Sequence, residues 1–439
     1  MTKRISSRHT YPHFADFRTR LYPMAQDLNP QGDQICKGLL QFHHAKPLGD
    51  RGLYWLKITL ANTAGQDKST WAERIAWVDA NHDMIIDSGL NPLDGQRLWA
   101  DPSIDEPYVF LAAAREYALA VGLDNPAHFL SRSVCAMDGV CNGMQILSLL
   151  GKDSVGAIKT NCSSLEKRYD LYSEISDAVI VLNNQRALEG REEALAWMGK
   201  ITRSTVKRAT MTTPYGVTPR GIAGQLVKDG FCDNIEGRKG TNAAYMRDLI
   251  VDALKTSVNS SSTIMEYFQQ SAKALAKQEL PLKWLTPTGV ECTQAYHKLR
   301  ETKVLTLMGT FRLWNEDRNT GLDERKNYLA ASPNVVHSFD AGLLQNVALR
   351  LKNDYGVTST AFIHDSYGVH HGQIECGENA VDVLHKVIRE EAHKIFKGNY
   401  LEEFREHILS YAPHVELPEA PAQGDFNVDE LLNSPYFFS

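Results

Sequence analysis

The sequence predicts an α+β protein that is mostly helical. Residues 70–330 carry apolar side chains mainly at helical spacing, most clearly in 112–121 and 165–187. Residues 335–372 instead contain a strand–turn–strand pattern, in which a His-Asp-Ser sequence interrupts β-branched and apolar residues. Hydrophobic residues make up 43% of the chain and charged residues 23%, which is typical of a globular protein with a large core.

The remaining elements follow from local signals. Residues 1–60 mix turn signals with short apolar runs. An apolar stretch that ends in Asp138 predicts a strand, and residues 144–150 predict a helix after it. Residues 379–394 predict a further helix, for which Asn379 is a suitable N-cap because its side chain can accept backbone N–H groups.

Composition also limits the function classes. The 439 residues contain no long apolar run, and no apolar stretch follows the basic N-terminal residues, so neither a membrane span nor a secretory signal is expected. Seven cysteines without a CxxC pair argue against a disulfide framework or a zinc ribbon and predict a reducing, cytoplasmic location. The net charge of −6 argues against a generally basic protein but permits a local basic groove for nucleic acid.

Two isolated acidic residues predict a metal site. Asp138 stands at a predicted strand end beside Gly139, where the alternative is a helix N-cap. Asp365 follows His364 between apolar runs, where the alternative is an ordinary turn residue. A carboxylate in such a position is costly to bury unless it is paired or binds a metal. Two such acids, far apart in sequence, are what a two-metal phosphoryl-transfer site with Mg²⁺ requires, and the sequence has no HExxH zinc pattern.

A third segment combines basic and aromatic residues. Four positions are spaced four apart, namely Arg203, Lys207, Met211 and Tyr215. On a helix they would share one slowly drifting face, whose cations would hold a triphosphate and whose tyrosine would meet a base or sugar. The alternative is a solvated basic face. Pro214 predicts that the helix bends or ends near Tyr215.

Together these segments resemble the bacteriophage-type single-subunit DNA-directed RNA polymerases, whose relatives include the mitochondrial RNA polymerases and, more distantly, family A DNA polymerases. Residues 138–145 are similar to the family's motif A, 203–216 to motif B and 364–366 to motif C, in the same order. Other similar segments run over nearly the whole chain: 16–22, 29–32, 37–38, 54–57, 61–68, 284–287, 311–313, 333–340 and 434–439. Three positions depart from the family without removing a metal ligand, namely Val140, Ile146 and Pro214.

The resemblance implies a right-hand polymerase fold of the family A and single-subunit RNA polymerase superfamily. The palm would comprise residues 1–166, with motif A, and 338–439, with motif C and the C-terminal foot. The fingers would comprise 167–337, with motif B and a hairpin that resembles the promoter-reading loop. Because only 15 residues precede Asp16, the thumb and N-terminal domain are expected to be absent. The chain would then be the larger, catalytic subunit of a heterodimeric phage enzyme, with a second polypeptide supplying the rest.

By the same resemblance, the chain would perform template-dependent nucleotidyl transfer from ribonucleoside triphosphates to an RNA 3′-OH. Asp138, the Gly139 carbonyl and Asp365 would bind two Mg²⁺ ions. Lys207 would protonate the leaving pyrophosphate. The expected partners are a DNA template, the RNA transcript and ribonucleoside triphosphates, in the host cytoplasm if a phage encodes the protein.

Further residues are expected to bind substrates. Tyr215 and His337 would favour the ribose 2′-OH. The triphosphate and the entering base would meet Arg203, Lys68, Gly216, Met211 and Tyr172. The template–transcript hybrid would meet Arg18, Arg20, Lys37 and His364.

Two alternatives stay open from the sequence. A family A-like DNA polymerase or primase-like enzyme with the same palm would use deoxynucleotides and would carry different residues at the positions of Tyr215 and His337. A catalytically inactive nucleic-acid-binding subunit would carry damaged metal ligands, whereas Asp138 and Asp365 are both intact.

Overall fold

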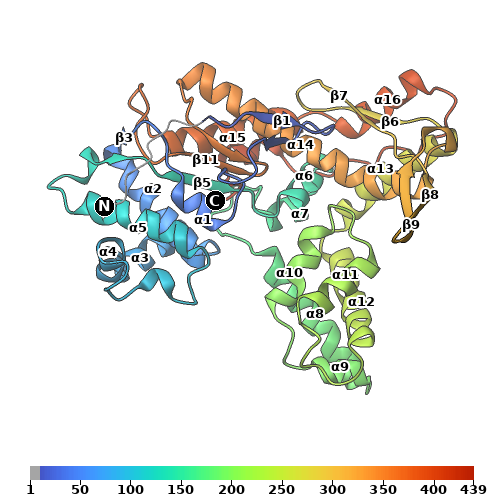
Figure 1. Cartoon of the computed structure of the whole chain (residues 1–439), viewed down its shortest axis with the longest axis horizontal. Helices are drawn as coiled ribbons and strands as arrows, with labels where there is room; N and C mark the ends of the chain where they lie inside the picture. Colours follow the sequence, from blue (N-terminus) through green and yellow to red (C-terminus); the bar gives the residue numbers. More distant parts are fainter. Residues whose placement is uncertain (1–9) are drawn as a thin grey trace.

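The structure is a computed structural model that describes residues 10–439, apart from the side chains of residues 259 and 318. It confirms a mostly helical chain with small antiparallel sheets (Figure 1). Helices α1–α5 gather at one end of the molecule, a three-stranded sheet lies in the middle beside α14 and α15, and helices α8–α12 form a projecting lobe. No helix within residues 10–439 has the length and hydropathy needed to cross a membrane.

The N-terminal region packs around helix α5. Its strands are β1 (His13–Ala15), β2 (Leu21–Pro23), β3 (Lys46–Pro47) and β4 (Leu130–Ser131), and its helices are α1 (Gln34–Leu39), α2 (Gly49–Ala61), α3 (Trp71–Ala80), α4 (His82–Leu90) and α5 (Pro107–Val121). Helix α5 begins with a proline, whose missing N–H costs nothing at a helix start, and it buries Phe110 and Tyr117 in the local core. The helix predicted over 112–121 is therefore confirmed, with additional residues at its N-terminal end.

The central sheet has the strand order β10–β11–β5, and both pairs are antiparallel. Its strands are β5 (Val134–Asp138), β10 (Ala361–Ile363) and β11 (Ser366–His370). The strand that ends in Asp138 and the strand–turn–strand pattern are both confirmed. Strand β10 begins only at Ala361, although the β-branched residues start at Val357. The Val357 N–H donates to the Leu351 carbonyl at 3.0 Å and so closes the end of helix α14 instead of entering the sheet.

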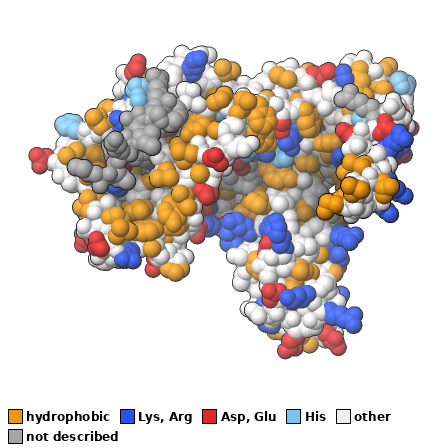
Figure 2. Space-filling view, in the orientation of Figure 1, with side chains coloured by type: hydrophobic (Ala, Val, Ile, Leu, Met, Phe, Trp, Pro, Cys, Tyr) orange, Lys and Arg blue, Asp and Glu red, His pale blue; other side chains and the backbone are white. Residues whose placement is uncertain are grey.

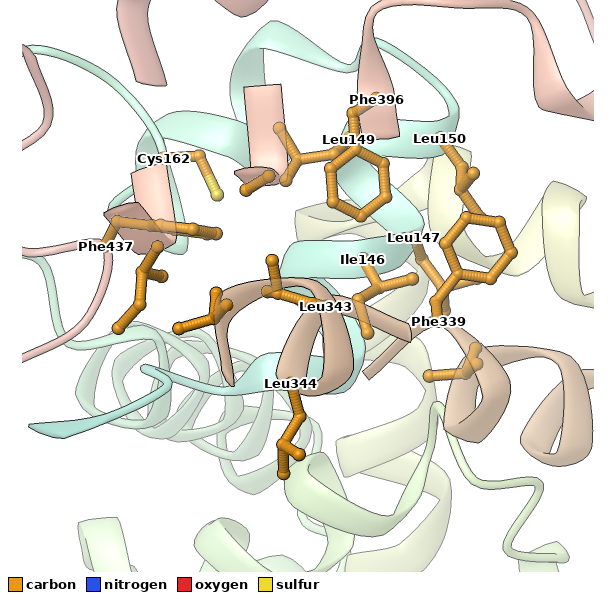
Figure 3. Close-up of a cluster of buried hydrophobic side chains, with 14 of the residues drawn as sticks. Ile146, Leu147, Leu149, Leu150, Cys162, Phe339, Leu343, Leu344, Phe396 and Phe437 are labelled. Atoms are coloured by element: carbon orange, nitrogen blue, oxygen red, sulfur yellow. The ribbon is translucent and has the colours of Figure 1, made fainter. Parts of the chain in front are cut away.

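The largest hydrophobic core lies behind this sheet. Its helices are α6 (Asn142–Leu150), α13 (Asn259–Lys277), α14 (Glu324–Tyr355) and α15 (Ala380–Phe396), flanked by α7 (Ser154–Lys159) and α16 (Tyr400–Tyr411). Figure 3 shows Ile146 and Leu147 of α6 among Phe339 and Leu343 of α14. Every residue of α6 is buried, so the departure from the family at Ile146 places an apolar side chain in apolar surroundings. Asn379 caps α15 as predicted, since its side chain accepts N–H groups of the first turn.

The projecting lobe has a hydrophobic core of its own. Its helices are α8 (Leu171–Leu188), α9 (Glu192–Trp197), α10 (Arg203–Thr212), α11 (Pro219–Lys228) and α12 (Lys239–Ser257). The helix predicted over 165–187 begins only at Leu171. The reason is that the Asp170 carboxylate accepts the Tyr172 N–H at 3.1 Å and caps the helix there, which leaves the preceding residues as a loop.

Residues 70–330 are mainly helical, as predicted, but two hairpins lie among these helices. Strand β6 (Leu282–Leu285) pairs with β7 (Glu291–Gln294), and β8 (Leu299–Thr306) pairs with β9 (Gly309–Glu316). Trp284 anchors the first hairpin, because its buried indole N–H donates to the Ser338 hydroxyl at 2.9 Å. The second hairpin is exposed along almost its whole length and carries Leu307 and Met308 at its tip.

Buried histidines predict a loss of stability in acid. The ring nitrogens of His371 lie 2.8 Å from the Thr59 hydroxyl and 3.0 Å from the Ser133 hydroxyl. Burial lowers the pKa of His371 to about 4 and the pKa of His385 to about 3, from the usual 6.5. The unfolded chain therefore binds protons below pH 6.5 that the folded chain does not bind until its lower pKa values are reached.

We therefore expect the free energy of unfolding, measured by urea denaturation, to fall as the pH drops from 6.5 toward 4. The expected slope is up to about 1.4 kcal/mol per pH unit for each such histidine. A His371→Gln variant should show a shallower slope than the unmodified protein. An unchanged slope in that variant would contradict the assignment to His371.

Candidate active site

The register of the central sheet brings Asp138 and Asp365 together. Asp138, the last residue of β5, pairs with Ser366, the first residue of β11, and Asp365 lies in the turn immediately before it. The Gly139 N–H donates to the Asp365 carbonyl at 3.0 Å, which fixes the turn against the end of β5. Asp138 caps no helix, because the residue before α6 is Cys141, so the N-cap alternative is wrong.

The surroundings of the two carboxylates, which we call the recess, are partly desolvated. Asp138 remains accessible to solvent and Asp365 is half-buried, yet desolvation by the surrounding protein raises the pKa of both. The charge of Asp138 raises the pKa of Asp365 further. The Ser366 hydroxyl, which hydrogen-bonds to Asp138, and the Lys37 ammonium oppose the rise at Asp138. Two accessible carboxylates whose ionised forms are destabilised in this way favour a bound cation.

The donor set at this recess fits Mg²⁺. Among residues 10–439, no group of three or more His, Cys, Asp and Glu side chains is arranged to hold a metal. Zinc sites normally use three or four protein ligands, often nitrogen or sulfur. Mg²⁺ is instead held by one or two carboxylates and keeps several waters, which matches Asp138 and Asp365 with the neighbouring Gly139 carbonyl.

Tyr215 and His337 form a stacked pair near the carboxylates. Their ring centroids lie 4.8 Å apart and their planes meet at 24°. Arg18 Nη1 lies 2.8 Å from His337 Nδ1, and since a guanidinium can only donate, Nδ1 accepts and the ring hydrogen is on Nε2. Burial, together with the Arg20 and Arg18 charges, lowers the pKa of His337 to about 2. His337 therefore has a neutral ring whose Nε2–H can donate.

Arg18 and Arg20, expected at the template–transcript hybrid, are both engaged by carboxylates. Arg20 Nε donates to Asp340 Oδ1 at 3.0 Å, a second guanidinium nitrogen binds the other oxygen, and Asp340 is only 2% exposed. Arg18 Nε donates to Asp16 Oδ2 at 2.9 Å. The Arg20 pair fastens the β1–β2 hairpin to α14. Sequence reasoning gave Asp340 no role, although it follows His337 by three residues and so shares its helix face.

Helix α10 ends before Tyr215. It stops at Thr212, and Pro214 lies in the turn that follows, which confirms the predicted end of the helix. Tyr215 therefore does not continue the face of α10, and the prediction of a single four-residue face is wrong for this residue. Pro214 and Tyr215 approach α6 at Gly143, where an added Cβ would come within 2.7 Å of the proline ring. The departure from the family at Pro214 thus accompanies close packing on α6.

Gly216 completes the turn with a φ of 72°, a conformation that glycine adopts without strain. An added Cβ would lie 3.0 Å from the Leu329 carbonyl oxygen of α14. In a regular helix the Leu329 carbonyl would accept the N–H of residue 333, but Pro333 has no N–H. The turn at Gly216 therefore packs on α14 where one helical hydrogen bond is missing. Gly216 therefore serves to position Tyr215 through its backbone.

Lys and Arg side chains gather where the projecting lobe meets the body (Figure 2). Arg203, the first residue of α10, donates from Nε to Asp170 Oδ2 at 2.5 Å. Lys68 pairs with Asp67 in the loop after a π-helical turn, Asn62–Gln66. Lys207 is exposed and forms no ion pair with the residues that the structure describes. The sequence did not predict that Asp170 pairs with Arg203. Its position before an apolar helix indicates only a helix cap.

Two of the residues expected at the entering nucleotide lie on the lobe. The Tyr172 ring lies under the Arg203 guanidinium at 5.0 Å. Its side chain also hydrogen-bonds to the Cys141 thiol, whose pKa is raised first by burial and further by the charge of Asp365. Tyr172 is thus joined to both the lobe and the recess. Met211 lies on α10 and is 42% exposed.

The remaining predicted residues are His364, in the turn between β10 and β11, and Lys37, on α1. The His364 ring meets the Tyr22 ring edge-on, with the centroids 5.0 Å apart. Burial, with the Arg20 charge, lowers the pKa of His364 to about 4, so its ring is neutral at neutral pH. Lys37 is exposed and lies 3.6 Å from Glu106.

Comparisons with known proteins give one family and several similar proteins. Residues 46–414 match the model of the family described as DNA-dependent RNA polymerase. The chain is 32% identical to the mitochondrial DNA-directed RNA polymerase 1 of Nicotiana sylvestris, over 98% of this chain and 43% of that protein. It is 33% identical to the chloroplastic/mitochondrial DNA-directed RNA polymerase 2 of Arabidopsis thaliana, over 98% of this chain and 42% of that protein. The chain thus spans less than half the length of these curated relatives.

Proposed function

Because the chain belongs to the family of DNA-dependent RNA polymerases, we propose that it is the catalytic chain of a template-directed RNA polymerase. It transfers a nucleoside monophosphate from a ribonucleoside triphosphate to the 3′-OH of an RNA paired with a DNA template, and pyrophosphate leaves. The observation that carries the proposal is the pairing of β5 with β11, which juxtaposes Asp138 and Asp365. The Tyr215–His337 stack lies close enough for the charge of Asp365 to act on Tyr215.

Asp138 and Asp365, with the Gly139 carbonyl, would hold two Mg²⁺ ions, which would supply Lewis-acid stabilisation. Arg203 and Lys68 bind the triphosphate from opposite sides of the recess, and Lys207 donates a proton to the departing pyrophosphate. The chain contributes mainly by positioning and charge, which together account for most phosphoryl-transfer catalysis.

The sugar is selected by Tyr215 and His337. The Tyr215 hydroxyl and the His337 Nε2–H are two polar groups in a half-buried stack, so each gains from a partner on the substrate. A ribose 2′-OH can accept from one and donate to the other, whereas a deoxyribose leaves them unpaired. This supports ribonucleotides over deoxynucleotides as substrates.

The remaining parts of the proposal concern the larger assembly. Residues 1–166 and 338–439 form the palm, and 167–337 form the fingers. Arg18, Arg20, Lys37 and His364 lie along the template–transcript hybrid, and the β8–β9 hairpin contacts promoter DNA. A second polypeptide and a cytoplasmic location stay predictions.

Primer extension tests the proposed function. The purified chain, with Mg²⁺ and an RNA primer annealed to a DNA template, is given ribonucleotides or deoxynucleotides. We expect template-directed extension with ribonucleotides. Extension with deoxynucleotides only would favour the DNA polymerase alternative. No extension, either alone or with a candidate second polypeptide, would favour the inactive nucleic-acid-binding subunit.

A Tyr215→Phe variant tests sugar selection. Removal of one hydroxyl should reduce the preference for ribonucleotides over deoxynucleotides by about 5- to 10-fold, the value of one hydrogen bond. The rate with ribonucleotides should change much less, because the Tyr215–His337 stack is retained. Competition between the two nucleotides in single-step extension measures the preference. An unchanged preference would rule out the Tyr215 hydroxyl as the discriminating group.

A further inference from the structure

Arg168 is a half-buried cation whose Nε–H has no hydrogen-bonding partner among residues 10–439. It stands in the loop before α8, and its Nε is shielded from solvent and accepted by no group. Within residues 10–439 its guanidinium forms neither a hydrogen bond nor an ion pair. A shielded N–H donor that lacks a partner is costly, because water does not replace its missing hydrogen bond.

The backbone beside Arg168 is held in place. Asn161, which is 3% exposed, receives the Tyr169 N–H on its Oδ1 at 2.8 Å and donates from its Nδ2 to the Tyr169 carbonyl at 3.0 Å. The Asn161 carbonyl in turn accepts from the Ser434 hydroxyl at 2.8 Å. This clamp fixes the residue after Arg168, so the unsatisfied guanidinium is presented from a fixed position.

The charges around Arg168 come from both sides of the recess. Asp67 and Asp170 attract its guanidinium, whereas Arg203 repels it, and burial lowers its pKa. Its charge also acts on the buried Arg74. Arg168 is therefore within electrostatic range of both the Lys68 loop of the body and the Asp170–Arg203 pair of the lobe.

The two carboxylates that act on Arg168 are each paired with another cation. Asp67 is paired with Lys68, and Asp170 is paired with Arg203, so neither carboxylate is left for a further cation. The Arg74 guanidinium donates to backbone carbonyls and to an amide oxygen, none of which carries a charge. Arg168 has no ion-pair partner of its own among residues 10–439. A polyphosphate would supply the negative charge that this guanidinium lacks.

We propose that Arg168 binds the triphosphate of the incoming ribonucleotide and the pyrophosphate that leaves it, beside Arg203 and Lys68. The inference rests on the proposed function and deepens it, because it adds a residue to the triphosphate site. Guanidinium groups bind phosphate oxygens by paired, charge-assisted hydrogen bonds, which are what the unmet donors of Arg168 require.

Single-turnover incorporation of one ribonucleotide tests this role. In Arg168→Gln the apparent dissociation constant for the ribonucleotide should rise about tenfold or more, the usual effect of a lost charge-assisted bond. The maximal rate should stay within about threefold, because the interaction is made in both ground and transition states. Arg168→Lys, which keeps the charge, should recover part of the affinity and also serves if the glutamine variant does not fold.

Lys167→Gln is the matched control, because the adjacent Lys167 is exposed and lies over the Tyr169 ring at 4.8 Å. It removes the same charge from the same loop and should leave the nucleotide affinity unchanged. A nucleotide affinity in Arg168→Gln equal to that of the unmodified protein would overturn the inference. So would an equal loss in Lys167→Gln, or a weakened affinity for the primer–template alone, since the latter would assign Arg168 to nucleic-acid phosphates.

Binding of inorganic tripolyphosphate, measured by calorimetry, provides a readout that does not depend on polymerisation. We expect binding to the unmodified protein to be weakened in Arg168→Gln and unchanged in Lys167→Gln. Suppose that tripolyphosphate binding depends on Arg168 but the protein extends no primer. That result would refute the proposed function while supporting the anion site. Binding that is indifferent to Arg168, in a protein that does extend primers, would refute the inference alone.

Discussion

Asp365→Asn is expected to abolish ribonucleotide incorporation, with a loss on the order of 10³-fold or more, while the fold is retained. The side chain lies in a two-residue turn, and the turn is held by the Asp365 carbonyl, which accepts the Gly139 N–H. The substitution keeps that backbone bond and the shape of the side chain. It removes the negative charge that a metal at this recess requires.

The measurement is single-step primer extension at saturating ribonucleotide, with circular dichroism as a check on the fold. Asp425→Asn is the matched control, because it makes the same change at an exposed residue away from the recess. Desolvation raises the pKa of Asp365, so the ionised side chain destabilises the folded protein at neutral pH. The asparagine variant carries no charge at this position and should therefore be no less stable than the unmodified protein. Activity within tenfold of the unmodified protein would remove Asp365 from the site.

Arg20→Gln is expected to destabilise the protein by about 3–5 kcal/mol, because it leaves a buried carboxylate without its partner. Asp340 is 2% exposed and receives two bonds from the Arg20 guanidinium. Urea denaturation at neutral pH measures the change. The paired variant Arg20→Gln with Asp340→Asn should recover much of the loss, since it removes the stranded charge.

Arg51→Gln is the comparison for this prediction. Arg51 also pairs with an aspartate, Asp382, but their side chains are 52% and 38% exposed. An exposed pair of this kind should contribute less than about 1 kcal/mol. Equal effects of the Arg20 and Arg51 substitutions would show that burial of Asp340 is not the cause.

The two acids of the recess could be identified from the sequence because each is marked locally. Asp138 ends an apolar strand, and Asp365 interrupts β-branched residues, so the antiparallel pairing of the two strands was sufficient to bring them together. Asn379 was recognised as a helix cap for the same reason, since capping depends on neighbouring residues only.

The ion pairs of the site could not be predicted in this way. Arg20 and Asp340 are separated by 320 positions, and Asp170 and Arg203 by 33. No local pattern marks a partner at such a distance, so the arginines were assigned to nucleic acid and nucleotide without their carboxylates. Arg168 could not be identified from the sequence either. Its Nε–H has no partner among the described residues, and only the three-dimensional contacts show this.

Local patterns also misplaced some boundaries. The apolar residues of 165–187 suggested a longer helix, but the capping carboxylate of Asp170 starts it later. The β8–β9 hairpin is exposed on both faces, so its strands lack the one-sided burial that makes a strand pattern clear.

The pairing of β5 with β11 has a consequence for the order of folding. Helices of the lobe and of the N-terminal region gain contacts with near neighbours in the chain, which form quickly. Strands β5 and β11 lie roughly half the chain apart, so the entropy of closing the loop between them is lost before any contact compensates for it. Helical content should therefore return well before catalytic competence. A chain cut between the two strands can keep much of its helix yet lose the recess, which makes activity a sensitive reporter of complete folding.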